Sequence, residues 1–63
     1  MHLTIREIVE MKRMGYTIKA AYRTAKGVPF PKYFRDREEM ERFTAEAEHA
    51  GSRLTASAER GIG

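Results

Sequence analysis

The chain has 63 residues, which is enough for one small domain with a modest core. It carries 12 Lys or Arg against 9 Asp or Glu, for a net charge of +3, and it has no cysteine, which excludes disulfides and thiolate zinc sites. No apolar run approaches the roughly 18 residues of a membrane-spanning helix, and the first residues lack the pattern of a signal peptide, so we expect a cytoplasmic protein with no membrane partner.

Residues 4–14 are predicted to form a helix. Thr4 followed by Glu7 fits a capping box, in which both side chains bind backbone N–H groups at the start of a helix. Gly15 suits the left-handed position just past the helix end. A strand stays open as the alternative, because several apolar residues of this segment also alternate.

Residues 16–26 fit two structures. As a strand, the segment would turn Ile18 and Tyr22 to one face and Lys19 and Arg23 to the other. As a helix, the segment would have an apolar stripe on one side and its basic residues on the opposite side. The N-terminal half of the chain would then be a helix-turn-helix. The β-forming residues at the start of the segment favour the strand.

Residues 28–34 are predicted to form an edge strand. Pro29 and Pro31 have no N–H to donate, and positions two apart direct their backbone groups to the same side. The other side stays free to pair with the preceding strand, so the prolines would face the outer edge and block further strands there. Phe30 and Phe34 share one parity and should cover the core.

Residues 36–50 carry the strongest helix signal. Asp36 is a good cap, Glu39 stands three residues further on, and Gly51 suits the end. An apolar stripe follows helical spacing, consisting of Met40, Phe43, Ala47 and Ala50.

The last predicted element is a strand over residues 52–58, with Leu54, Ala56 and Ala58 facing inward and a frayed tail over 59–63. The chain therefore predicts a single α+β domain over residues 1–63, in the order helix, β-hairpin, helix and strand, with the helices packed on a small antiparallel sheet.

The sequence carries no pattern of catalytic residues. His2 and His49 are the only histidines, and no cysteine is available to complete a metal site. The glycines form no phosphate-binding loop, and the serines have no base at a suggestive spacing. We therefore expect no metal, no cofactor and no enzymatic activity.

Charge is distributed unevenly along the chain, which points to a macromolecular partner. Residues 1–35 carry eight Lys or Arg against two Glu, whereas residues 36–63 carry four against seven acidic residues. Aromatic and Arg side chains dominate affinity in protein interfaces. The predicted partner-binding residues are Lys19, Arg23, Lys26, Lys32, Tyr33 and Arg35.

The layout of residues 16–58 resembles small phage and mobile-element inhibitors of the anti-CRISPR type. The resemblance lies in a hairpin, the stretch PFPKYFRDREEMERF, a helix, a glycine and a short strand. It implies a non-catalytic inhibitor that binds a larger host defence complex of the CRISPR-Cas type and blocks its nucleic-acid site. Many such inhibitors are acidic, whereas this chain is net basic.

The alternative is a small basic nucleic-acid-binding protein, of either helix-turn-helix or sheet-face type, which would use Lys19, Arg23 and Lys26. A chain this short also gains stability from association, so a homodimer is a further expectation.

Overall fold

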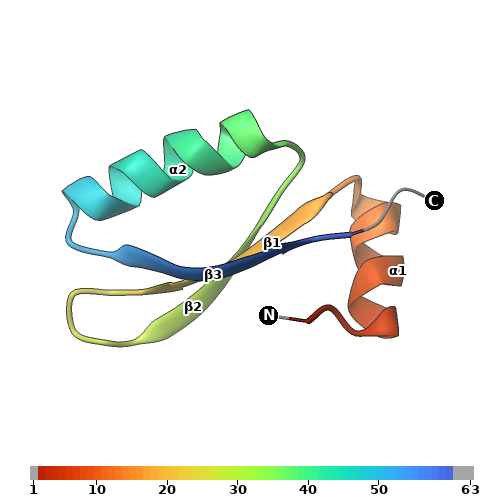
Figure 1. The fold of residues 1–63 in the computed structure, drawn as a ribbon, viewed down its shortest axis with the longest axis horizontal. Coiled ribbons are helices and arrows are strands. Elements are labelled where there is room, and N and C mark those ends of the chain that lie inside the picture. Colours follow the sequence, from red (N-terminus) through yellow and green to blue (C-terminus); the bar gives the residue numbers. More distant parts are fainter. Residues whose placement is uncertain (1, 61–63) are drawn as a thin grey trace.

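The computed structural model describes residues 2–60 of the chain. Its elements follow in the order α1 (Ile5–Met14), β1 (Ile18–Arg23), β2 (Pro29–Phe34), α2 (Arg37–His49) and β3 (Arg53–Glu59). The three strands form one antiparallel sheet in which β1 lies between β2 and β3 (Figure 1). This arrangement confirms the predicted α+β layout of helix, hairpin, helix and strand.

Both helices begin and end where local signals place them. Thr4 and Glu7 form the capping box of α1, and Gly15 ends that helix in the left-handed conformation at φ 83°. At α2, the Asp36 side chain accepts a hydrogen bond from the backbone N–H of Glu39 at 2.8 Å. These contacts satisfy donors that a helix start otherwise leaves unpaired.

The ambiguous segment is a strand, so the helix-turn-helix alternative is wrong. Ile18, Ala20 and Tyr22 of β1 are buried, whereas the alternate residues face the other side of the sheet. As the central strand, β1 pairs its backbone groups with a strand on each side. Its alternate apolar residues pack in the core with residues of α2. Tertiary pairing therefore decides a segment whose local pattern fits two structures.

The core lies between α2 and one face of the sheet. Its buried members are Ile18, Ala20, Tyr22, Phe34 and Met40, with Phe30, Phe43 and Leu54 packed around them. The Tyr22 ring is completely buried, and its hydroxyl is hydrogen-bonded to that of Thr44 at 2.8 Å. Phe30 and Phe34 thus face the core as predicted.

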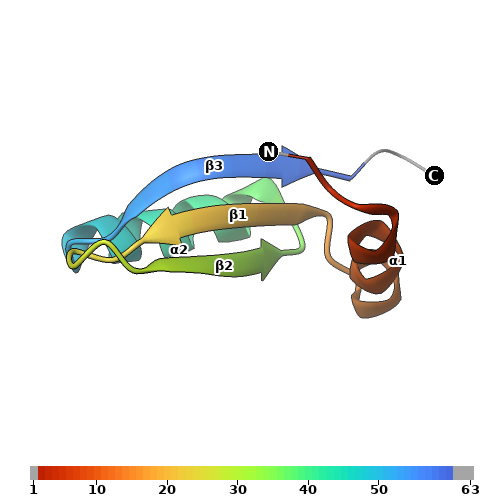
Figure 2. The same ribbon diagram turned by 90° about the horizontal axis from the view of Figure 1, so that it is seen from below.

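Helix α1 lies beyond the end of the sheet instead of on either face. Figure 2 shows α2 behind the sheet and α1 past the end where β1 begins. Met11 is the one residue of α1 that is buried, at 2% exposed. The expectation that both helices pack on a sheet face therefore holds for α2 alone.

The edge strand β2 behaves as predicted. It pairs with β1 alone, and its two prolines lie opposite Arg23 and Ala21. Because proline has no N–H, the outer edge of β2 presents an interrupted row of donors.

A β-bulge in β3 changes which of its residues face the core. Ala56 pairs with Ala21 and Leu54 pairs with Tyr22, which leaves Thr55 as an extra residue. Leu54 therefore faces the core as predicted, but Ala56 and Ala58 lie on the opposite face, and the prediction for these two was wrong. One inserted residue reverses the side of every residue beyond it.

The predicted tail begins too early in the sequence. Glu59 is the last residue of β3, and the backbone N–H of Arg60 donates to the carbonyl of Thr17 at 2.9 Å. The remaining tail positions, 61–63, lie outside the described residues.

Candidate functional site

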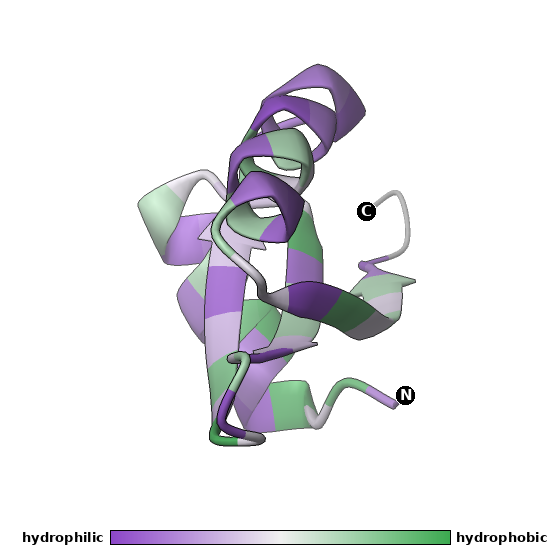
Figure 3. Ribbon diagram, turned by 90° about the vertical axis from the view of Figure 1, so that its left-hand side faces the viewer, coloured by the Kyte–Doolittle hydropathy of each residue, from purple (hydrophilic) through white to green (hydrophobic). Residues whose placement is uncertain are grey.

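In the part of the chain that the structure describes, no helix lies over one face of the sheet, and we call this face the open face. Figure 3 looks along the domain from one end and shows α2 above the sheet. Strand parity and register place nine residues on the side away from α2: Lys19, Ala21, Arg23, Pro29, Pro31, Tyr33, Arg53, Ala56 and Ala58. Small and proline side chains thus form its floor, and cations stand at its ends.

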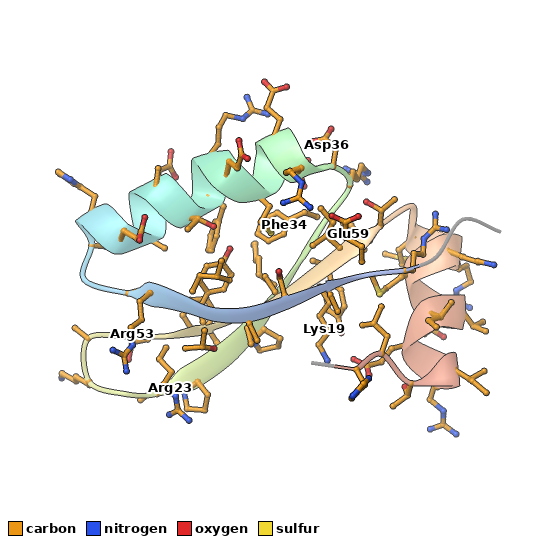
Figure 4. All side chains as sticks on the ribbon, viewed as in Figure 1. Lys19, Arg23, Phe34, Asp36, Arg53 and Glu59 are labelled. Carbon is orange, nitrogen blue, oxygen red and sulfur yellow. The ribbon has the colours of Figure 1, made fainter. Side chains whose placement is uncertain are left out.

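Two arginines lie side by side at the hairpin end of the open face. Arg23 of β1 is the register partner of Arg53 of β3, and both side chains are exposed. Figure 4 shows them at the same end of the sheet, on the side away from α2. Arg23 Nη1 donates to the carbonyl of Gly27 at 2.8 Å, whereas Arg53 makes no ion pair within residues 2–60.

A shallow groove of about 420 Å³ runs along this part of the open face. Its lining combines Pro29, Pro31 and Ala21 with the cations Lys19 and Arg23. Like charges directly opposite each other in a sheet are unfavourable, so Arg23 and Arg53 form a site where an anion would relieve repulsion.

At the other end of the open face, Lys19 is held by α1. Its ammonium donates to the Glu7 carboxylate, and both side chains are about four-fifths buried. This hydrogen bond lowers the pKa of Glu7 and raises the pKa of Lys19. Lys19 therefore anchors α1 to the sheet, and its charge is already compensated.

A stacked tyrosine pair lies between α1 and the sheet. The rings of Tyr16 and Tyr33 have centroids 5.8 Å apart. Arg35 Cζ lies 5.4 Å from the centre of the Tyr16 ring, and Lys19 Nζ lies 5.9 Å from that of Tyr33. Both cations lie within about 6 Å of a ring centre, where cation–π attraction stabilises the arrangement.

The tyrosine pair forms one wall of a second groove, of about 370 Å³, which we call the Tyr–Met groove. Met11 and Met14 of α1 line it with Tyr16 and Tyr33, and three charged residues stand around it: Arg6, Glu7 and Glu10. Methionine adapts its shape to irregular apolar partners, which suits a groove that accepts a side chain.

Helix α1 also presents large apolar side chains to solvent. Ile5 is 82% exposed, Val9 57% and Met14 55%. Ile5 and Val9 lie about one turn apart on one side of α1, whereas Met14 lies on the side that lines the Tyr–Met groove.

The predicted site residues do not form one surface. Lys19, Arg23 and Tyr33 share the open face, whereas Lys26 lies in the β1–β2 turn. Lys32 has the parity of the core residues, and its Nζ lies 5.1 Å from the centre of the Phe43 ring, on the α2 side of the sheet. A single contact surface containing both Lys19 and Lys32 was therefore a wrong expectation.

Arg35 lies at the sheet end beside Tyr16, next to the Tyr–Met groove. Sequence reasoning missed Arg53. Because Leu54 was predicted to face inward, its neighbour Arg53 could have been predicted to face outward. The position of Arg53 beside Arg23 depends on the order of the strands, which the sequence does not specify locally.

Among residues 2–60, no group of three or more His, Asp or Glu side chains is arranged to hold a metal ion. Neither described helix has the length and apolar character needed to cross a membrane. Comparisons of the chain with protein-family models, with curated proteins and with solved structures found no match.

Proposed function

We propose that this chain is a non-catalytic protein-binding module that contacts its partner through the open face and the adjoining side of α1. One observation carries the proposal: within residues 2–60, a sheet face without a helix over it, with an apolar floor and two arginines that make no ion pair, adjoins the Tyr–Met groove. Aromatic residues, Met and Arg are the residue types enriched at protein interfaces.

Exposed apolar area favours a protein over a polyanion as the partner. Covering apolar surface contributes about 25 cal/mol for each Å² removed from water, and this gain requires an apolar surface on the other side. Phosphate backbones offer charge instead. The Tyr–Met groove adds a concave apolar surface of the kind in which interface anchors are buried.

The narrower proposal is that the partner is a host defence complex of the CRISPR-Cas type, larger than this chain, whose nucleic-acid site the chain blocks. It is supported by the resemblance in layout over residues 16–58. Such a complex, once captured by the chain, should lose affinity for its target DNA or RNA.

Nucleic-acid binding is the second candidate, and the register pair Arg23–Arg53 favours it. Guanidinium groups suit phosphate oxygens, these two belong to register partners on neighbouring strands, and Lys26 in the β1–β2 turn adds a third cation. Binding of this kind weakens steeply as salt rises, because each neutralised phosphate releases counterions.

A pull-down from the source cell separates these candidates. The tagged chain should capture a specific protein after nuclease treatment of the lysate, and the double variant R23E/R53E should capture less of it. Arg42→Glu is the control for one Arg-to-Glu replacement outside the contact surface, to be compared with R23E and R53E singly, since Arg42 is exposed on α2, which covers the opposite face. Tight binding to random 20-base-pair DNA with a steep salt slope, without protein capture, would replace the first proposal by the second.

A further inference from the structure

The open face has two ends of different chemistry. At the α1 end, Tyr33 belongs both to the open face and to the Tyr–Met groove, which is apolar inside. At the hairpin end stand the arginines Arg23 and Arg53. A ligand that covers the whole face therefore meets an apolar groove at one end and two cations at the other.

The separation of the two ends follows from strand geometry. Tyr33 is the register partner of Lys19, and Arg23 lies four residues further along β1. At about 3.3 Å for each residue of a strand, the ends are about 13 Å apart. An extended peptide covers this distance in about four residues, because its own rise is similar.

The floor between the ends lets a peptide backbone approach closely. Ala21 and Pro31 are register partners in the middle of the face, and Ala56 lies opposite Ala21 on the other side. None of these side chains extends far above the sheet. The peptide would lie over side chains, since the outer edge of β2 carries prolines and offers few donors for an added strand.

The chemistry of the two ends sets the direction and composition of the peptide. Apolar side chains line the Tyr–Met groove, and the carboxylates around it are already paired, Glu7 with Lys19 and Glu10 with Arg13, so this end suits an apolar anchor. The unpaired charge of Arg53 beside Arg23 favours a carboxylate at the hairpin end, where charge-assisted hydrogen bonds to guanidinium groups are strong.

We propose that the open face binds an extended acidic segment of the partner protein, with an apolar side chain in the Tyr–Met groove and an Asp or Glu about four residues away at the Arg23–Arg53 pair. This inference rests on the proposed function and names the chemistry of the partner.

A selection from random peptides tests the pattern. A displayed library of random 12-residue peptides is selected on the immobilised chain and counter-selected on R23E/R53E. Peptides with an aromatic or long aliphatic residue three to five positions from an Asp or Glu should be enriched. No enrichment, or enrichment of peptides without an acidic residue at that spacing, would overturn the inference.

Binding constants then assign each end of the peptide. Fluorescence anisotropy of a fluorescein-labelled selected peptide should show affinity reduced about tenfold or more by Arg53→Glu and by Arg23→Glu, and unchanged by Arg42→Glu. Tyr33→Ala should weaken the peptide with its apolar anchor more than a peptide in which Ala replaces that anchor. Equal losses of affinity for both peptides would show that the apolar side chain does not bind in the Tyr–Met groove.

The outcomes also separate this inference from the proposed function. Capture of a specific protein that R23E/R53E leaves unchanged would retain a protein-binding module but overturn the acidic segment. Displacement of the peptide by random 20-base-pair DNA at lower concentration than by unlabelled peptide would overturn both and favour the nucleic-acid candidate. Far-UV circular dichroism of every variant confirms that the fold is intact.

Discussion

Replacing Arg53 by Glu should make the protein more stable while it weakens partner binding. In the sheet, Arg53 lies opposite Arg23, so the substitution exchanges a like-charge register pair for one of opposite charge. Opposite-charge cross-strand pairs contribute about 0.2–1 kcal/mol, and like charges directly opposite are destabilising. Both side chains are exposed, and solvent screening places the expected gain at about 0.5 kcal/mol.

For a domain of this size, each 1 kcal/mol shifts the Tm by about 4–8 °C, so R53E should melt about 2–4 °C higher than the natural chain. Thermal unfolding followed by circular dichroism at low salt measures this shift. Arg53→Gln should lie between the two, because it removes the repulsion without adding attraction.

Salt provides the internal control. In 1 M NaCl the Debye length is about 3 Å, so the difference in Tm between R53E and the natural chain should shrink. An R53E variant that melts at or below the natural chain at low salt would refute the idea that the two arginines repel each other. A more stable variant that binds less peptide would show that the lost binding does not come from unfolding.

Three further predictions concern the core, the α1 anchor and the turn before β3. Tyr22→Phe and Thr44→Val should each lower the free energy of unfolding, measured in urea, by about 1–2 kcal/mol, because each leaves one hydroxyl without its partner. The double variant should lose less than the sum of the two, and strictly additive losses would show that the two hydroxyls are not coupled. The pKa of Glu7 lies below its ordinary 4.5 because Lys19 donates to its carboxylate. The contribution of this carboxylate to stability is therefore complete above pH 4.5 and is lost as the pH falls through the lowered pKa. Glu7→Gln should flatten that part of the pH–stability curve, and an unchanged curve would contradict the ion pair. Gly51 has φ 94°, and an added Cβ would lie 3.2 Å from the side chain of Ala25 in the β1–β2 turn. Gly51→Ala should therefore lower the free energy of unfolding by about 1–3 kcal/mol. An unchanged midpoint of urea unfolding would show that the turn adapts to the added methyl group without cost.

Local signals predicted most of the fold because the residues that decide it are neighbours in sequence. Thr4 and Glu7 cap α1, and Asp36 caps α2, in each case within three residues. The prolines of β2 identify an edge strand because a missing N–H is a local property. The segment that includes Ile18 was ambiguous because its neighbours allow both periods, and only pairing on both edges settles it.

The candidate site was harder to predict because it depends on which strands lie side by side. Arg53 reaches Arg23 only because β3 returns to pair with β1, and no local pattern specifies this order. The bulge at Thr55 is likewise a property of the pair of strands. Lys32 is different, since its shared parity with Phe30 was enough to separate it from the open face.

The bulge in β3 has a further consequence for how two copies of the chain can meet. In a regular strand, Arg53 and Glu59 would have the same parity, and two antiparallel copies aligned about Ala56 would set each arginine against the glutamate of its twin. With Thr55 inserted, Arg53 projects from the open face while Glu59 projects toward α2, where it is ion-paired with Arg37. Arg53 and Glu59 thus lie on opposite sides of the sheet. Two copies that paired through β3 could not form these two Arg–Glu ion pairs on one face, so charge would not align them.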